Sequence, residues 1–114
     1  MAIPRAQVAH NIDVDQTEDA IKASPGVLYG YMCSNVSAGV RYVKLYDATV
    51  ATVEVGTTVP KLTIGVAAGA VVNAEFTRGI PFYTAITVAA TTGVADNDTG
   101  APGANDVIFE ALYE

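Results

Sequence analysis

The residues best suited to chemistry lie in the run Asp96-Asn97-Asp98-Thr99-Gly100. Calcium takes several oxygen ligands, and this D-x-D-x-G opening resembles the start of a calcium-binding loop. The EF-hand pattern then fails, because it requires Gly at the place of Ala101 and a bidentate Glu at the place of Val107. An irregular calcium site with ligands from other loops stays open. The alternative is a solvated turn in which Asx side chains bond the backbone.

The other reactive side chains are isolated. Nucleophilic catalysis needs a base beside a Ser, Thr or Cys, but the only histidine, His10, lies in a polar N-terminal stretch where nothing would orient its ring. The only cysteine, Cys33, lies among apolar residues with no basic neighbour, which predicts a buried, unreactive thiol. No tryptophan provides a platform for a sugar. We therefore expect a protein that is not an enzyme and needs no cofactor or metal.

Charge and hydropathy exclude two kinds of partner. Six Lys and Arg residues against twelve Asp and Glu give a net charge of −6, and the basic residues are scattered along the chain. Binding to nucleic acid depends on clustered basic residues that neutralise phosphates, so we expect none. Hydrophobic residues make up 51% of the chain, but no run approaches the roughly 18 apolar residues of a membrane span. We expect no membrane partner and no secretory signal.

The elements that must position any site are short β-strands. Runs rich in Val, Ile, Thr, Tyr and Phe alternate with clusters of Gly, Pro, Asn and Asp, a spacing typical of a sandwich or barrel. We predict an all-β, two-sheet antiparallel β-sandwich of about seven strands, either immunoglobulin-like or jelly-roll-like. The candidate strands are residues 20–23, 27–34, 40–46, 61–66, 71–76, 82–89 and 107–113.

The first residues differ from the rest in composition. Residues 1–18 are polar with isolated apolar side chains, which predicts an extended N-terminal arm in front of a sandwich domain at residues 19–114. The arm could equally include an edge strand at residues 6–9. Such an arm can bind a partner by placing its apolar side chains in pockets. The apolar candidates for partner binding are Ile3, Val8, Ile12 and Val14.

Tyrosines are the remaining resource for recognition. Tyr29 and Tyr31 share one face of a predicted strand, and Tyr42 and Tyr46 share one face of the next. Such pairs can stabilise neighbouring strands or fill the core. They can also form a contact surface, because tyrosine combines an apolar ring with a polar hydroxyl. We therefore treat these four residues as further candidates for partner binding.

Several segments, in order, resemble a family of small virion proteins of tailed bacteriophages, from about residue 20 to the C-terminus. They are residues 26–31 (GVLYGY), 34–35, 40–47 (VRYVKLYD), 56–62 (GTTVPKL), 78–82 (RGIPF) and 90–98 (ATTGVADND). The resemblance implies a structural protein without catalytic residues, made in the bacterial cytoplasm and carried in the virion. Its preferred role is a decoration (cement) protein on the capsid surface, bound to the major capsid protein.

Two alternatives to capsid decoration remain. One is a structural module of the tail, neck or fibre. The other is a carbohydrate- or receptor-binding module that uses Asp96, Asp98 and the tyrosine pairs. The high apolar content and the tyrosines also favour a homo-oligomer. A trimer is expected only by analogy with decoration proteins.

Overall fold

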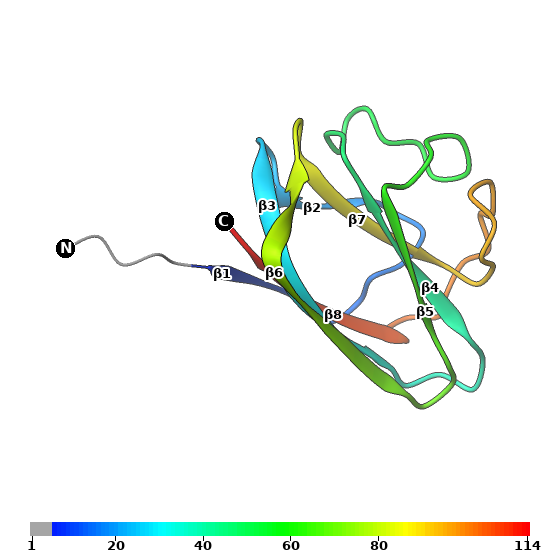
Figure 1. The fold of residues 1–114 in the computed structure, drawn as a ribbon. Coiled ribbons are helices and arrows are strands. Elements are labelled where there is room, and N and C mark those ends of the chain that lie inside the picture. Colours follow the sequence, from blue (N-terminus) through cyan, green and yellow to red (C-terminus); the bar gives the residue numbers. More distant parts are fainter. Residues whose placement is uncertain (1–5) are drawn as a thin grey trace.

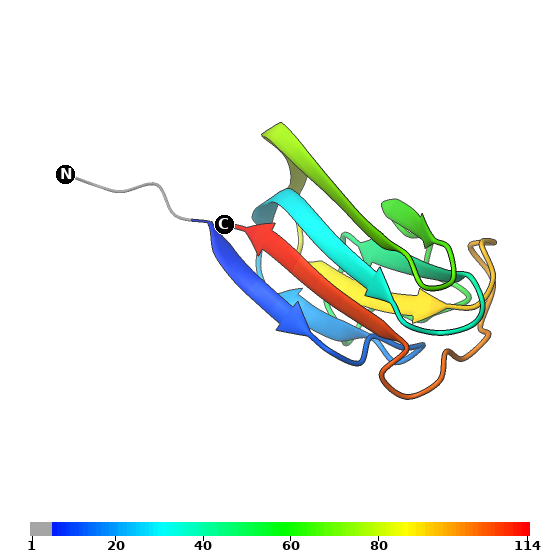
Figure 2. The ribbon, with the colours of Figure 1, turned by 90° about the horizontal axis from the view of Figure 1, so that it is seen from below.

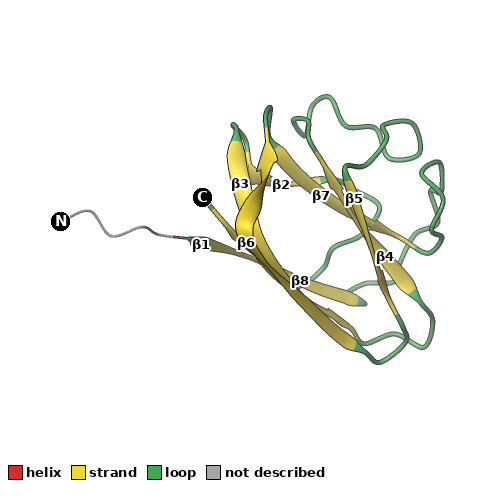
Figure 3. Ribbon diagram, in the orientation of Figure 1, coloured by secondary structure: helices red, strands yellow, loops and turns green. Residues whose placement is uncertain are grey.

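The computed structural model of this chain describes residues 6–114. Within that range the chain forms strands joined by loops and no helix (Figures 1 and 3). The eight strands are β1 (Gln7–Asn11), β2 (Asp19–Lys22), β3 (Gly26–Asn35), β4 (Arg41–Tyr46), β5 (Leu62–Val66), β6 (Val71–Phe82), β7 (Ile86–Thr91) and β8 (Val107–Tyr113).

The strands form two antiparallel sheets of four that pack face to face, so the predicted β-sandwich is confirmed. One sheet has the order β1-β8-β3-β6 and the other β2-β7-β4-β5. The first strand thus pairs with the last, the second with the seventh, the third with the sixth and the fourth with the fifth. A long hairpin rolled up on itself produces this order, which is that of a jelly roll. Figure 2 shows β1 (blue) and β8 (red) side by side.

The core lies between the inner faces of the two sheets. Its largest fully buried apolar side chains include Leu28, Phe82 and Phe109. The predicted strand at residues 107–113 is confirmed as β8, in which Val107, Phe109 and Ala111 are buried while the residues between them are not. Burial of apolar surface is the main favourable term in folding. Each of the two sheets therefore needs an apolar inner face, turned toward the other sheet.

The outer faces of the two sheets differ. Every residue of β7 is buried, and Tyr46 packs with Val53 and Ala89 in a second, smaller cluster on the outer side of β2-β7-β4-β5. The loops that follow β4 and β7 lie over this sheet (Figure 3). The outer face of β1-β8-β3-β6 carries no such cover from residues 6–114. The sandwich therefore leaves one of its two broad faces open.

The predicted arm of residues 1–18 is wrong for the part that the structure describes. β1 pairs with β8 in an unbroken register from Gln7–Tyr113 to Asn11–Phe109. The alternative of an edge strand is the correct one, although the strand is residues 7–11 rather than 6–9. The segment looked polar because the inward-facing side chains of β1 are small or polar. The strand is held in the sheet by its pairing with β8, and burial of apolar side chains contributes less to its stability.

The chain after β1 is also part of the sandwich. Val14 is fully buried, and its N–H donates to the carbonyl of Val107 at 3.1 Å. The carbonyl of Asp15 accepts from the N–H of Ala90 at 2.7 Å. These bonds tie the segment between β1 and β2 to both sheets. The domain boundary that the sequence suggested at residue 18 is therefore not observed.

The end of β6 is the second departure from the predicted strands. The sequence predicted separate strands at residues 71–76 and 82–89, but β6 continues to Phe82. Gly30 pairs with Glu75 and Leu28 with Ile80, so residues 76–79 bulge out of the strand. Gly79 has a φ of 74°, a conformation that costs L side chains energy. The glycine and proline signals here mark a bulge rather than a chain reversal.

Gly79→Ala is expected to destabilise the protein more than Gly69→Ala does. Both glycines have positive φ, but a Cβ on Gly79 would lie 2.2 Å from Cγ1 of Val27, whereas Gly69 has no atom within 4 Å. We expect a loss of roughly 1 kcal/mol for Gly69→Ala from strain and about 2–4 kcal/mol for Gly79→Ala, where overpacking adds to it. Urea denaturation of both variants measures the difference. Equal losses would show that Val27 moves aside freely.

Candidate interaction surface

The outer face of β1-β8-β3-β6 carries apolar side chains in solvent. Val8 of β1 pairs with Leu112 of β8 in the register, and Met32 of β3 lies on the same side of the sheet. These side chains are 60%, 39% and 46% exposed, and Val71 of β6 is exposed as well. Exposed apolar surface on a small protein is a candidate contact site. We call this surface the open face; it comprises Val8, His10, Met32, Val71, Asn73, Glu75, Ile108, Glu110 and Leu112.

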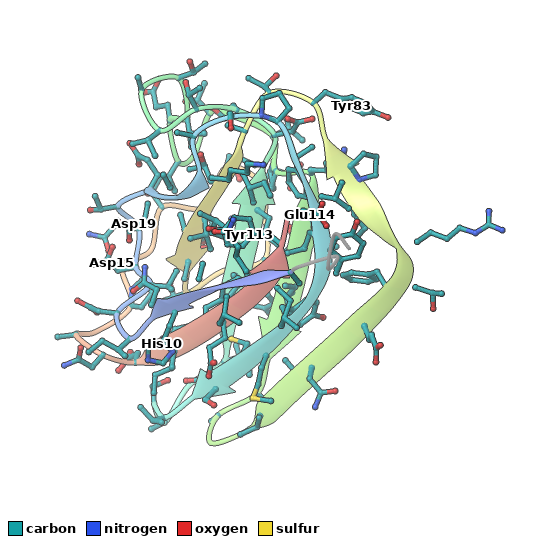
Figure 4. All side chains as sticks on the ribbon, turned by 90° about the vertical axis from the view of Figure 1, so that its left-hand side faces the viewer. His10, Asp15, Asp19, Tyr83, Tyr113 and Glu114 are labelled. Atoms are coloured by element: carbon teal, nitrogen blue, oxygen red, sulfur yellow. The ribbon has the colours of Figure 1, made fainter. Side chains whose placement is uncertain are left out.

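Polar residues of the open face separate these apolar side chains. His10 and Glu110 are paired across β1 and β8, with Nδ1 of the histidine 3.7 Å from Oε1 of the glutamate. Figure 4 looks onto this side of the molecule and shows His10 on β1. Asn73 and Glu75 alternate with inward-facing residues along β6. The open face thus mixes exposed apolar side chains with acidic ones, and Glu110 lies on the inner strand β8 and not at the edge of the sheet.

A hollow of about 550 Å³ lies on the open face over β3 and β6. Gly30 forms part of its floor, and Tyr29, Met32 and Phe76 are among the residues that line it. A Cβ on Gly30 would lie 2.7 Å from the carbonyl oxygen of Ala74. Glycine is required because the neighbouring backbone approaches so closely. The hollow is large enough to take a side chain of a partner, and Met32 can adapt its shape to one.

The tyrosines of β3 do not share a face. Tyr29 is the extra residue in the register shift between Leu28 and Gly30, which breaks the alternation on which the prediction relied. Tyr31 therefore packs against the core, with its ring centroid 5.9 Å from that of Phe109. Burial raises the pKa of Tyr31. Of this pair, Tyr29 borders the hollow on the open face and Tyr31 serves the interior.

The tyrosines of β4 lie on the other sheet. Tyr46 is fully buried under the loop that follows β4, with no hydrogen-bond partner for its hydroxyl within the described part of the chain. Burial raises the pKa of Tyr46. The prediction that Tyr46 binds a partner is wrong, because the loop covers it first. Tyr42 is half-buried beside Gly65, and its role as a contact residue stays a prediction.

The apolar candidates near the N-terminus have different fates. Val8 and Ile12 are exposed, so both can meet a partner. Val14 is buried in the core and cannot, which makes that prediction wrong. The side chain points inward because its backbone is held by β8. Ile3 lies outside the described residues.

The Asp96–Gly100 run folds as the solvated turn. One carboxylate oxygen of Asp98 accepts from the N–H groups of Gly93 and Gly100, at 3.1 and 2.8 Å. Lys44 reaches the same loop from β4 and donates to the carbonyl of Ala95 at 2.6 Å. Loss of solvation lowers the pKa of Lys44, and the charges of Asp98 and Asp96 oppose that shift. A cation bound at this loop would be repelled by the ammonium group of Lys44.

Other reactive groups are placed as single residues. Cys33 is fully buried, as predicted, and burial raises the pKa of its thiol to about 11, so the reactive thiolate is scarce near neutral pH. Across residues 6–114, no three His, Cys, Asp or Glu side chains are grouped so that they could hold a metal ion. Over the same residues, no helix is long and apolar enough to span a bilayer.

The comparisons with known proteins give no relative. No family model, no curated protein and no solved structure matches this chain. The architecture and the open face are therefore the structural findings that bear on function.

Sequence reasoning missed most of the open face. It recognised Val8 but not Met32, Val71 or Leu112, because the core of a sandwich was expected to absorb the apolar residues of a strand. A signal was present in β8, where Ile108 and Leu112 alternate with the inward-facing residues. Apolar residues on both faces of a strand indicate either a covering element or an unfilled contact.

Proposed function

We propose that this chain is a structural virion protein that decorates and stabilises the outside of a phage capsid by binding the assembled major capsid protein. The open face is the observation that carries the proposal, because a jelly roll with one covered and one uncovered sheet is suited to lie flat on a surface. The resemblance of residues 40–47 and 90–98 to virion proteins supports the same role. Jelly rolls recur in viral capsids, although a fold alone does not determine a function.

The open face would contribute to binding in two ways. Val8, Met32 and Leu112 would lose solvent on contact, which is favourable for each apolar side chain that becomes buried. Glu75 and Glu110 would lie among or beside them and favour basic groups on the capsid protein. A protein that binds the assembled shell and not its free subunits stabilises the shell by mass action.

The tail, neck or fibre alternative would use the same face. It differs in the number and position of the copies, which would be few and confined to the tail. The carbohydrate alternative has less support, because two of the residues that suggested it are not available to a ligand. Tyr46 is buried, and Asp98 is engaged by backbone N–H groups. An electron-microscopy map of intact particles separates head from tail directly.

Met32→Lys is expected to weaken binding to particles about tenfold or more, since a charge at the centre of an apolar contact is costly. The new ammonium group would lie opposite Glu110 in the register, so the free protein should remain folded. Val59→Lys is the matched control, because Val59 is exposed in the loop between β4 and β5. Co-sedimentation with particles that lack the protein measures both variants. Equal binding by both would refute a role for the open face.

A further inference from the structure

β1 has a free edge. It is the terminal strand of β1-β8-β3-β6 and pairs on one side only. From the backbone of this edge we propose that two copies of the chain pair through β1, antiparallel and about a two-fold axis at Ala9. The two sheets of four strands would then form one continuous sheet of eight.

The hydrogen bonds of β8 show which backbone groups of β1 are free. Glu114 and Val27 exchange both backbone bonds at 2.9 Å, so the backbone of Glu114 faces β3. Successive residues of an antiparallel strand turn their N–H and C=O groups to opposite sides. The backbone N–H and C=O groups of the odd-numbered residues of β8 therefore point toward β1. The bond from Val14 to the carbonyl of Val107 agrees with this assignment.

The register carries that alternation into β1. Gln7, Ala9 and Asn11 are opposite odd-numbered residues of β8, and these three residues form the hydrogen-bonded pairs. The N–H and C=O groups of Val8 and His10 point away from the sheet. Such unpaired groups on an edge strand are a template for another strand.

Antiparallel pairing about Ala9 places Val8 opposite His10 of the second copy, and the reverse. Each of these pairs exchanges both of its backbone hydrogen bonds, so every outward group of the two residues gains a partner. A two-fold interface must be self-complementary in this way. No different protein is needed to complete the edge, which is why a second copy is the occupant we name.

Two of the three other edges, β6 and β2, carry features that prevent pairing. The third, β5, also lacks charged residues and proline, and the carbonyl of Val66 at its end already accepts from Nδ2 of Asn35. β6 contains the bulge at residues 76–79 and Pro81, and β2 begins with Asp19, ends with Lys22 and has a register shift. Charges, prolines and bulges are the usual protection of an edge. β1 reads Gln-Val-Ala-His-Asn, with no Asp, Glu, Lys, Arg or Pro. Each copy carries a net charge of −6, but two copies could meet at β1 without repulsion between like charges in the paired strands.

The pairing would also cover apolar surface. A cavity of about 510 Å³ opens between β1 and β2, and the core residues Val88 and Phe109 are part of its lining. Asn11 and Asp19 are joined across its mouth by a side-chain hydrogen bond of 3.0 Å. A second β1 would extend along this mouth. On the other side of the sheet, Val8 would join the two open faces into one surface.

A two-fold pairing gives a dimer, in place of the trimer expected by analogy. The test uses the purified chain in solution, so its result is independent of the capsid role. Sedimentation velocity over a concentration series should show a dimer. Val8→Pro removes an outward N–H that β8 does not use, and proline is tolerated at that position of an edge strand. Val8→Lys adds a charge to the edge.

Both Val8 variants should raise the dimer dissociation constant at least about tenfold, with melting curves that show a folded chain. Val94→Lys is the matched control, because Val94 is 60% exposed, as Val8 is, but lies in the loop before β8. It should leave the dimer intact. A monomer at every concentration, a trimer, or a dimer that survives both Val8 variants would overturn the proposal.

A disulfide tests the register. Ala9 would face Ala9 of the second copy in a non-hydrogen-bonded pair, where Cα atoms lie about 4.5 Å apart, within the range for a disulfide. Ala9→Cys should therefore form a covalent dimer under mild oxidation, and His10→Cys should not. Cys33 is fully buried and gives no background. Crosslinking of His10→Cys in preference to Ala9→Cys would refute the two-fold axis at Ala9.

Discussion

A chain that lacks residues 1–18 is expected to show no cooperative thermal unfolding. β8 would lose its neighbour along the whole of β1, and its outward backbone groups would be left without partners. The core would lose Val14, and the inward side of Phe109 would be open to water. Whole domains are stable by only about 5–15 kcal/mol, and removal of a paired strand costs a large part of that. Circular dichroism during heating measures the outcome.

Single substitutions locate the source of this loss. Val14→Ala should lower the free energy of unfolding by about 2–3 kcal/mol, since it removes buried methyl groups and leaves a cavity. Ile12→Ala, two residues away and exposed, should change it by less than about 0.5 kcal/mol. A truncated chain with a sharp transition near that of the full chain would instead support a separate arm.

Replacing Asn35 with Ala is expected to have the second largest effect, a loss of about 3–4 kcal/mol. Asn35 is buried at the end of β3, and its Nδ2 donates to the carbonyls of Gly39 at 2.8 Å and Val66 at 2.9 Å. Its Oδ1 accepts from the N–H and the hydroxyl of Ser37. The variant leaves the buried carbonyl of Val66 without this donor, at a cost of about 1–3 kcal/mol, and it also removes the part-buried bonds to Gly39 and Ser37.

The side chain of Asn35 is effective because it joins three segments. The turn between β3 and β4, the end of β5 and β3 itself meet at this one amide. Asn73→Ala is the control, since Asn73 is exposed on β6. Urea denaturation should show a shift for Asn35→Ala and almost none for Asn73→Ala. Similar small shifts for both would mean that water replaces the amide.

The sequence predicted the strands of the sandwich well where one face of a strand is buried and the other is not, because the residue types then alternate. In β8 the alternation of Val107, Phe109 and Ala111 sufficed. Prediction from the sequence failed for β1, which is held in place by pairing with β8 and not by burial of apolar side chains. The inward side chains of β1 are Gln7, Ala9 and Asn11. Prediction failed again in β6, because glycine and proline signal a bulge and a turn alike. The choice of a jelly roll depends on which strands meet, and no local pattern records that.

The contact surface was harder to predict than the fold. Strand periodicity placed Tyr29 and Tyr31 on one face, and a single extra residue in the register separated them. Tyr46 was assigned correctly to one side of its strand, but the loop that covers that side comes from later residues. Whether an apolar side chain on an outer face is exposed depends on such cover. Position within a strand does not decide it.

The pairing of the first strand with the last also sets the order in which this protein can be built. A ribosome makes β1 first of the eight strands, but its neighbour β8 is made last of them, and β8 then lies between β1 and β3. Until β8 emerges, the apolar sides of the earlier strands have no complete sheet to join. Contacts so distant in sequence slow folding. The first sheet can therefore close only after β8 has been made, so a product interrupted before β8 would remain without a closed sheet and be open to proteases.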